Sequence, residues 1–318
     1  MKPLSFLLLL LFTSCTQKPA SPTIVTDETS TSIVLNEQPL LTYVHAITPA
    51  PEGVDPLYKR SAYIHPLRSP GGEILTRIQP EDHYHHYGIW NPWTHTNFGT
   101  DSVDFWNLAL GQGTVRFAEY LDEYENEGEA GFKVRHDHIY FTEDGGEKVA
   151  IDETWELRIH SALDTVYLAD ITVTLSTPME TGITLEAYRY GGGLAYRGTE
   201  KWNPGNCRVL TSEGKTWSDA DATMARWAFV EGESSVPQGR SGILFLSHPA
   251  NHSHPEPMRL WSPIANGGES NVFFEFCPIR HQEWILESHK EYTLKYRMVV
   301  FDGEMDVETA ESHWKNFQ

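Results

Sequence analysis

The sequence has little cysteine, little positive charge and no long apolar run beyond its first residues. Of its 3 cysteines, Cys207 and Cys277 lie in the body of the chain, which excludes a disulfide framework. We expect these two as buried thiols, with a single bridge as the alternative. Lys and Arg number 24 against 44 Asp and Glu, a balance that opposes binding to nucleic acid and to anionic lipid through charge. An acidic ligand would therefore need arginines gathered in one place.

The N-terminus has the pattern of an export signal. Lys2 precedes an apolar run from Leu4 to Phe12, and small residues then lead to Cys15. The run is about half of the ~20 residues that a membrane-spanning helix needs. Residues 1–15 are therefore predicted as a lipoprotein signal peptide with a lipidated Cys15, and secretion without lipid is the alternative. We predict an exported protein, anchored by lipid in the cell envelope at the periplasm or outer membrane, that meets the membrane only through this anchor.

The rest of the chain divides into a tether and one domain. Residues 16–32 are rich in Ser, Thr and Pro, which predicts a solvated tether. Residues 33–318 suffice for one large all-β domain with its own core. Within it, polar and apolar residues alternate over Thr154–Ile159, Thr165–Leu175 and Tyr292–Met298, so each stretch is expected to bury one face. We predict an all-β fold, an antiparallel β-sandwich of two packed sheets.

Turn and helix signals punctuate these strands. Glycines, most of them beside Asp or Asn, predict hairpin turns at residues 144–146, 191–193, 266–268 and 302–303. Helical periodicity is convincing only at the end of the chain, where Asp306 can cap a helix from Val307 to Phe317. A weaker helix or a loop is expected over Asp219–Met224. The sandwich is therefore expected to carry one short C-terminal helix.

Chemistry-bearing residues concentrate between Asp82 and Trp90, where His83, His85 and His86 stand close together. A histidine can act as base, acid or metal ligand because its unperturbed pKa lies near physiological pH. In an extended chain His83 and His85 would share one face and His86 the other, so we expect at most a neighbouring pair of rings in one pocket. A wet loop of hydrogen-bonded imidazoles is the non-functional alternative.

Metal binding is a second interpretation of the histidine segment. His-x-His on a strand offers two ligands, and a catalytic zinc site usually takes three from the protein. His248, His252, His254 or an acidic residue could supply the third, although no His-Glu-x-x-His or Cys-x-x-Cys pattern is present. The prediction is no cofactor, with a divalent metal as the alternative.

Arginine and aromatic residues are candidates for the walls of the same pocket. Arg60 and Arg189 each stand among aromatic residues, and the planar guanidinium group matches both oxygens of a carboxylate. Flat indole rings suit the apolar faces of sugars. Four tryptophans near loops are therefore pocket candidates, namely Trp90, Trp93, Trp106 and Trp261, whereas Trp155 and Trp284 are expected in the core.

A pattern of segments runs through about the whole mature chain: Arg60, Tyr63–Leu67, Ser69–Gly72, Asp82–Trp90, Asp104–Trp106, Tyr188–Tyr190, Trp227, His248–Asn251, Tyr296–Arg297 and Asp302–Gly303. This pattern resembles the PmoA-like family of exported bacterial proteins. The family label borrows the name of a methane monooxygenase subunit, which is an integral membrane protein and which this chain does not match. The chain departs from the family at Phe276–Ile279, where relatives often carry Asn before Pro.

The resemblance implies a β-sandwich related in shape to sugar-processing sandwiches, common in Bacteroidota among polysaccharide-degradation functions. It also implies a carbon-oxygen lyase: an oligosaccharide dehydratase that removes water from a terminal uronic acid, as in ulvan breakdown, with an acidic oligosaccharide as substrate. A base would take the proton at C5, an acid would protonate the hydroxyl leaving C4, and a cation would hold the developing charge. A glycoside hydrolase using carboxylates such as Asp82, Asp104 or Glu186 is one alternative. A non-catalytic sugar-binding lipoprotein is the other.

These considerations assign residues to two roles. Histidine and tyrosine serve as base and acid, and arginine serves as the cation. The predicted catalytic residues are His83, His85, His86, Tyr190, Arg60 and Arg189. The predicted substrate-binding residues are Tyr84, Trp90, Asp104, Trp106, Trp227, His248, Asn251 and Trp261.

Overall fold

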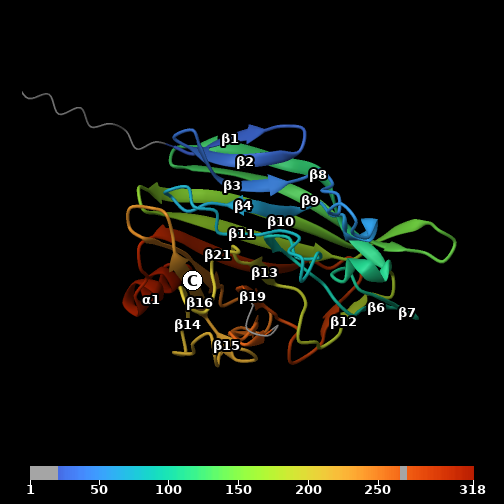
Figure 1. Ribbon diagram of the computed structural model, residues 1–318. Helices are drawn as coiled ribbons and strands as arrows, with labels where there is room; N and C mark the ends of the chain where they lie inside the picture. Colours follow the sequence, from blue (N-terminus) through green and yellow to red (C-terminus); the bar gives the residue numbers. More distant parts are fainter. Residues whose placement is uncertain (1–20, 266–270) are drawn as a thin grey trace, which may run out of the picture.

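The computed structural model describes residues 21–265 and 271–318, and antiparallel strands make up most of it (Figure 1). Two large sheets of nine and eight strands and a small sheet of four strands form its framework. The predicted signal peptide with Cys15 and the predicted turn at 266–268 lie outside the described residues. Within the described residues, no helix has the length and apolar character that crossing a membrane requires.

The nine-stranded sheet has the spatial order β1-β2-β3-β4-β5-β13-β19-β18-β15. Its strands are β1 Thr23–Thr26, β2 Ser30–Leu35, β3 Gln38–Val44, β4 Tyr63–Leu67, β5 Ile89–Trp90, β13 Leu194–Arg197, β19 Phe273–Phe276, β18 Glu256–Leu260 and β15 Met224–Ala225. Strands β1 to β5 follow one another as a meander, whereas β13 joins beside β5 from far along the chain. Because the amide N–H of Arg197 donates to the Gly88 carbonyl oxygen at 2.8 Å, this crossover brings Arg197 next to the histidine segment.

The eight-stranded sheet has the order β14-β16-β17-β21-β11-β10-β9-β8. Its strands are β14 Cys207–Thr211, β16 Trp227–Glu233, β17 Arg240–Ser247, β21 Tyr292–Asp302, β11 Val166–Ser176, β10 Glu147–Leu163, β9 Glu129–Phe141 and β8 Gly113–Asn126. Every second residue of β11 is buried, from Tyr167 to Leu175. This is the alternation that the sequence predicts, and each large apolar side chain turned inward contributes about 1.5–3 kcal/mol to the free energy of folding.

The small sheet and the helices complete the fold. The sheet consists of β20 Trp284–Leu286, β12 Ile183–Leu185, β6 Thr96–Phe98 and β7 Asp101–Val103. Two short 3-10 helices are η1 Pro56–Tyr58 and η2 Leu108–Leu110, and one α-helix, α1, spans Val307–Lys315. The Asp306 carboxylate accepts a hydrogen bond from the Thr309 amide at 2.7 Å, so the predicted N-cap and C-terminal helix are confirmed.

The two large sheets pack face to face around one continuous core. Tyr43 in β3 lies 5.7 Å, centroid to centroid, from the ring of Phe132 in β9. Farther along, Phe245 in β17 lies 4.9 Å from Phe274 in β19. Figure 1 shows β3 and β4 drawn beside β9 and β10, with β13 and β19 beside β21. The predicted antiparallel β-sandwich is therefore confirmed.

Several local predictions need correction. Strand β1 and the start of β2 fall within the predicted tether over 16–32, because Thr23–Thr26 pairs with β2. The turn at 144–146 does join the hairpin of β9 and β10. Residues 191–193 instead connect strands of different sheets, and residues 302–303 lead from β21 toward α1. Of the helix or loop expected over Asp219–Met224, the structure has the loop: turns that lead into β15 at Met224.

The two described cysteines match the favoured expectation. Cys207 and Cys277 are free thiols, with Cys277 buried and Cys207 partly buried. Burial raises the pKa of both thiols, that of Cys207 to about 12, so neither is a reactive thiolate at neutral pH.

Candidate active site

The histidine segment folds as consecutive turns and not as a strand. The amide of His83 donates to the Pro80 carbonyl oxygen at 2.9 Å, and the amide of His86 donates to that of His83 at 3.0 Å. The prediction of strand alternation is therefore wrong here. Curling the backbone brings all three imidazoles together, with ring centroids 4.8 Å apart for His83 and His86, 4.8 Å for His85 and His86, and 5.4 Å for His83 and His85.

These three rings form one side of a cavity of about 230 Å³. The other sides come from the loop before η2, from the segment that follows β12, and from the end of β18. The lining residues are His83, His85, His86, Trp106, Asn107, Tyr188, Arg189, Tyr190 and Trp261. This histidine cavity brings together seven of the residues predicted as catalytic or substrate-binding. They are His83, His85, His86, Trp106, Arg189, Tyr190 and Trp261.

Several polar atoms around the histidine cavity have no partner within the described residues. His86 is buried, and neither of its ring nitrogens makes a hydrogen bond; the indole nitrogen of Trp106 is in the same state. Buried polar groups in native proteins are nearly always paired, so such atoms need an explanation. Burial, together with the charge of neighbouring groups, lowers the pKa of His85 to about 3 and that of His86 well below its usual value. Both rings are therefore neutral at pH 7 and can accept a proton or a hydrogen bond.

His83 differs from its neighbours because it has a carboxylate beside it. Its Nδ1 lies 3.1 Å from Asp82 Oδ2, at ion-pair distance although not aligned as a hydrogen bond. Asp82 in turn accepts from Arg197 Nη2 at 2.7 and 3.0 Å. Partial burial alone would raise the pKa of Asp82, but His83 and Arg197 outweigh it and hold that pKa well below its usual range. An ionised Asp82 stabilises positive charge on His83 and orients the ring.

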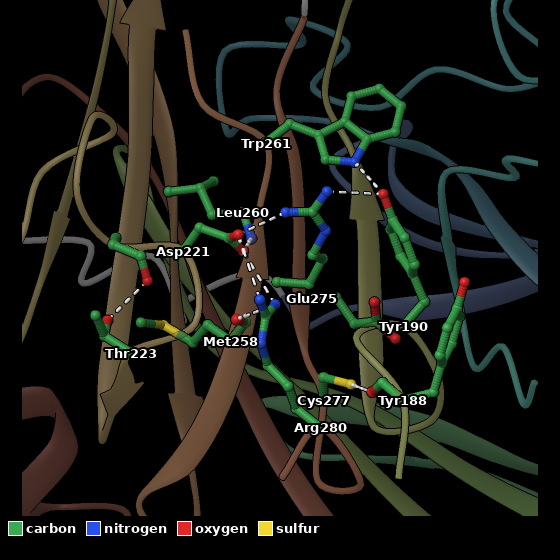
Figure 2. A network of polar contacts seen from close by, with 12 residues as sticks. Tyr188, Tyr190, Asp221, Thr223, Met258, Leu260, Trp261, Glu275, Cys277 and Arg280 are labelled. Carbon is green, nitrogen blue, oxygen red and sulfur yellow. Dashed lines mark hydrogen bonds and ion pairs between the residues drawn. The ribbon is translucent and has the colours of Figure 1, made fainter. Parts of the chain in front are cut away.

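Tyr190 faces these histidines across the cavity, and its phenol oxygen accepts two hydrogen bonds. Arg259 Nη2 donates to it at 2.8 Å and Trp261 Nε1 at 3.0 Å. Figure 2 shows the Trp261 and Tyr190 side chains turned toward each other at this contact. Because both neighbours are donors, the hydroxyl hydrogen of Tyr190 remains available for a ligand in the cavity.

An ion-pair network behind Tyr190 fixes the position of Arg259. Asp221 accepts from Arg259 Nη1 at 2.6 Å and from Arg280 Nη1 at 3.0 Å (Figure 2). Burial works against the charge on Arg259, yet the contacts with Tyr190 and Asp221 raise its pKa. A phenolate formed at Tyr190 would therefore meet a guanidinium group that is permanently charged and already oriented.

The glycine run after Tyr190 is required by close packing. Gly192 has φ +75°, and a Cβ atom there would lie 2.0 Å from the Trp93 ring. The amide of Gly191 donates to Glu275 Oε1 at 2.8 Å. Cys277 Sγ contacts the Tyr188 carbonyl oxygen at 3.6 Å (Figure 2). These contacts bind the backbone of residues 188–193 to β19 and hold Tyr190 at the cavity.

Arg189 stands at the open side of the cavity. Its side chain is exposed, and its Cζ atom lies 5.3 Å from the centroid of the Tyr190 ring. Within the described residues it forms no ion pair, so the guanidinium group is free to meet an anion. Of the two arginines predicted as a carboxylate clamp, Arg189 therefore has the suitable position.

Arg60 occupies a different environment. It is 2% exposed, pairs through its backbone with Thr48, and does not line the histidine cavity. Burial lowers its pKa to about 10, although nearby tyrosines and Glu153 favour its charged form. The prediction of Arg60 as clamp is corrected, because its side chain is enclosed by the protein interior.

Two predicted substrate-binding residues support the cavity from behind. Trp90 is buried, and its ring lies 5.2 Å from that of His86. Asp104 Oδ1 accepts from the amides of Trp106 and Asn107 at 2.8 and 2.7 Å. Both residues therefore shape the cavity walls and do not line it.

Four further predicted residues lie away from the cavity and make other contacts. Trp227 donates from Nε1 to Glu311 of α1 at 2.8 Å, and the ring of His248 packs 5.3 Å from Phe317. Asn251 Nδ2 donates to Glu256 at 2.7 Å, and the ring of Tyr84 packs 5.5 Å from Tyr58. Their assignment to the substrate-binding set is corrected, since the fold uses them in packing and hydrogen bonding elsewhere.

Sequence reasoning missed the residues that position the cavity from other strands. Arg197 ends β13, Arg259 lies in β18, and Asp221 lies in the turns before β15. None of them belongs to a local motif, so only the fold reveals their contacts. Tyr188 and Asn107 stood beside predicted residues, and the Tyr-Arg-Tyr pattern was the signal that could have included Tyr188.

The structure does not support the alternative of a metal site in residues 21–265 and 271–318. No group of three His, Cys, Asp or Glu side chains there has an arrangement that could hold a metal ion. The proposed third ligands lie elsewhere, since His248 and His254 pack near Phe317 and Trp314. The absence of a cofactor itself stays a prediction.

Comparison with protein families identifies the chain over residues 30–315. It belongs to DUF6807, a family of unknown function. A comparison with curated proteins gives no match. These findings leave the resemblance to the PmoA-like family a prediction.

Two solved structures are similar to the chain in shape. One is the heparan sulfate lyase HepC from Pedobacter heparinus, with 6% identity and a TM-score of 0.39, covering 92% of this chain and 36% of that one. The other is a galactose mutarotase related enzyme from Lactobacillus acidophilus, with 8% identity and a TM-score of 0.30, covering 89% of this chain and 98% of that one. The chain thus spans about a third of the length of HepC. At this level of similarity neither protein assigns an activity to the chain.

Proposed function

We propose that this protein is a carbohydrate-active lyase that removes water by β-elimination from a terminal uronic acid of an oligosaccharide. The observation that carries the proposal is the histidine cavity. His83, with Asp82 beside it, lines this cavity together with the neutral and unpaired His86. Tyr190 and Arg189, which forms no ion pair in the described residues, line it too. A base, an acid and a cation are the three groups that this elimination needs.

His83 is the base in this mechanism. With Nδ1 beside Asp82, its Nε2 is the ring nitrogen left for substrate. It takes the proton from C5, next to the sugar carboxylate, and the electron pair of that C–H bond becomes the C4=C5 double bond. Asp82 stabilises the imidazolium that forms, and Arg197 holds Asp82 in place.

Tyr190 is the acid. As the C4–O bond breaks, the departing hydroxyl takes the phenol proton and leaves as water. The phenolate left behind accepts N–H bonds from Arg259 and Trp261, which offset its charge. A proton passing from His83 to Tyr190 through solvent restores both groups, so the net reaction releases one water and a 4,5-unsaturated sugar.

Arg189 is the cation that holds the uronic carboxylate. An unaided carboxylate leaves C5 a very weak acid, because negative charge must spread onto a group that is already anionic. A bidentate guanidinium contact offsets that charge as it develops in the transition state. We propose that no cofactor takes part, since Arg189 supplies the positive charge.

The lining of the cavity also bears on the alternative of hydrolysis. A glycoside hydrolase uses two carboxyl groups that flank the scissile bond. Within the described residues the cavity is lined by His, Tyr, Trp, Asn and Arg side chains. Of the three carboxylates considered for hydrolysis, Asp104 caps a turn and Glu186 bonds to Asn97. The third, Asp82, lies beside His83 but is paired with Arg197 and does not line the cavity. The residues therefore favour elimination.

The test is product analysis by mass spectrometry and ultraviolet absorbance after incubation with uronic-acid-ended oligosaccharides. We expect a mass lower by one water and the absorbance of a conjugated enol ether. Chain shortening with water gained would instead establish hydrolysis. Binding of the same sugars with no change in mass would establish a sugar-binding protein. Activity that a chelator abolishes and zinc restores would contradict the assignment of the histidines as proton-transfer groups.

A further inference from the structure

A second and larger concavity lies beside the histidine cavity. This groove has a volume of about 780 Å³ and runs between the end of β4, the chain before the histidine turns and the segment after β13. Sites for drug-sized ligands fall at roughly 300–1,000 Å³, so the groove has room for several sugar units whereas the histidine cavity, at about 230 Å³, suits one.

The groove and the cavity share one loop. Pro80 and Glu81 line the groove, and His83 lines the cavity. Since two residues of chain span at most about 7 Å, the two spaces are close neighbours. Asp82 lies between these residues in the sequence and forms an ion pair with Arg197. A sugar chain that leaves the cavity past this loop therefore reaches the groove.

The distribution of unpaired arginines sets these two spaces apart from the rest of the molecule. Ten arginines form ion pairs with carboxylates: Arg116, Arg135, Arg158, Arg197, Arg208, Arg226, Arg240, Arg259, Arg280 and Arg297. Among residues 21–265 and 271–318, Arg60, Arg68, Arg77 and Arg189 form none. Arg60 is buried in the interior, Arg189 lines the cavity, and Arg68 and Arg77 line the groove.

Arg68 and Arg77 are held in place by neutral partners. Arg68 Nη1 donates to the Gly72 carbonyl oxygen at 3.1 Å, and Arg77 Nη1 donates to Asn271 Oδ1 at 3.0 Å. Three carboxylates also line the groove: Glu73 pairs with Lys201, whereas Glu81 and Glu200 are exposed, and none of the three pairs with these arginines. In a chain with 44 acidic residues against 24 basic ones, two arginines without a carboxylate are suited to an anion from outside.

We propose that the groove binds the anionic sugar units that follow the terminal uronic acid, with Arg68 and Arg77 contacting their sulfate or carboxylate groups. This inference rests on the proposed function, because it takes the cavity as the place of the terminal unit. It adds to that function a second binding region, and with it a rise in affinity as the number of anionic sugar units increases.

The experiment measures binding of sulfated, uronic-acid-ended di-, tetra- and hexasaccharides by calorimetry, with Tyr190→Phe present in every protein compared so that the sugars stay intact. The full mature protein is compared with Arg68→Gln/Arg77→Gln, which removes both charges and keeps amide donors. The matched control is Lys215→Ala/Lys290→Ala, which removes two exposed charges engaged in surface ion pairs. We expect affinity to rise about tenfold or more from di- to hexasaccharide in the unmodified protein and in the control. In the arginine variant the di- and hexasaccharide should bind with similar affinity.

Desulfated and carboxyl-reduced hexasaccharides, tested on the unmodified protein, do not depend on the folding of any variant. Loss of the gain with one of them supports the inference and names the anion. An unchanged gain with both, or equal affinity for di- and hexasaccharide, overturns it. Loss of water from the substrate without an effect of length on affinity would support the proposed reaction and refute the groove. A length effect without water loss would retain the groove and refute the reaction.

Discussion

Two clusters of histidines in residues 21–265 and 271–318 differ in how many of their nitrogens have hydrogen-bond partners. In the core cluster only His138 Nδ1 lacks one, whereas the cavity cluster leaves His83 Nδ1 and both ring nitrogens of His86 without one. In the core, Glu153 Oε2 lies 2.8 Å from His138 Nε2 and 3.3 Å from His136 Nδ1, and its other oxygen accepts from Trp155 at 2.7 Å. All of these side chains are buried. In the cavity, by contrast, His86 makes no hydrogen bond, and His83 has a carboxylate on one side only.

The comparison teaches that partners, and not the number of histidines, separate a structural cluster from a candidate site. Burial alone would raise the pKa of Glu153, but hydrogen bonds with His136 and His138 hold it well below its usual range. Burial also lowers the pKa of His136, so the core cluster is a hydrogen-bonded network around an ionised carboxylate. The cavity cluster instead leaves acceptors facing an open space. Four experiments can break or sharpen this distinction, from the largest expected effect to the smallest.

Removing the carboxylate at the centre of the core cluster should give the largest loss of stability. Glu153→Ala leaves His136, His138 and Trp155 without their shared acceptor. Each buried polar group left unsatisfied costs about 1–3 kcal/mol, so the total loss should be about 3 kcal/mol or more. Denaturant unfolding measures the change. Glu156→Ala, on the same strand but partly exposed, is the control and should cost less than about 1 kcal/mol. Similar values for the two variants would show that the core network is not stabilising.

Alanine variants of one histidine from each cluster should separate the effect on activity from the effect on stability. His83→Ala should lower turnover by at least about 10²-fold with little change in unfolding, because a base is lost from an open cavity. His136→Ala should lower stability by about 1–3 kcal/mol and leave the rate per folded molecule nearly intact. Kinetics and unfolding curves on both variants check this. The distinction collapses if His136→Ala loses activity while remaining folded.

Because all three histidines line one space, His85→Ala and His86→Ala should also impair turnover. The fold thus revises the expectation from strand alternation, in which two losses are deep and one is mild. The sequence shows which residues gather in this segment, but the turn that joins His83 to His86 depends on backbone hydrogen bonds that residue types alone do not specify. Likewise Arg197 and Arg259 reach the cavity only through sheet pairing between distant strands.

Other parts were open to prediction for physical reasons. The period of two in Val166–Ser176 and the cap at Asp306 are local properties, so the strand and the helix follow from the sequence itself. Trp227 and His248 show the opposite case. Their chemistry suits a sugar site equally well, and only packing against α1 and its following residues reveals their structural use.

Replacing the guanidinium group of Arg189 by an ammonium group should have a moderate effect on turnover. Arg189→Lys keeps the charge but loses the bidentate contact, so turnover of acidic substrates should fall about tenfold or more. The melting temperature should not change, because Arg189 is exposed and unpaired within the described residues. The control is Arg116→Lys, the same change at an arginine of β8 that does not line the cavity, and it should keep full activity. Full activity of Arg189→Lys on uronic substrates would refute the clamp.

Acid should destabilise the fold through the cavity cluster by a smaller amount. Burial and the charge of His83 depress the pKa of His85 from 6.5 to about 3. Arg197 and Arg60 lower this pKa further, whereas Asp82 raises it. Below about pH 6.5 the unfolded chain therefore binds a proton that the folded chain refuses, and stability falls until about pH 3. Between pH 7 and pH 5 the free energy of unfolding should fall in the unmodified protein. In His85→Gln it should fall by roughly 1 kcal/mol less, as measured by denaturant unfolding. An identical pH dependence would show that His85 does not titrate as its surroundings imply.

The most direct test of the central claim is an NMR titration of protein carrying isotope-labelled histidines with a uronic-acid-ended oligosaccharide. Tyr190→Phe keeps the ligand intact during the measurement, and single histidine variants assign the signals. We expect the imidazole signals of His83, His85 and His86 to shift on binding, while those of His136 and His138 stay in place. Shifts confined to the core pair, or binding that leaves all three cavity histidines unchanged, would contradict the account.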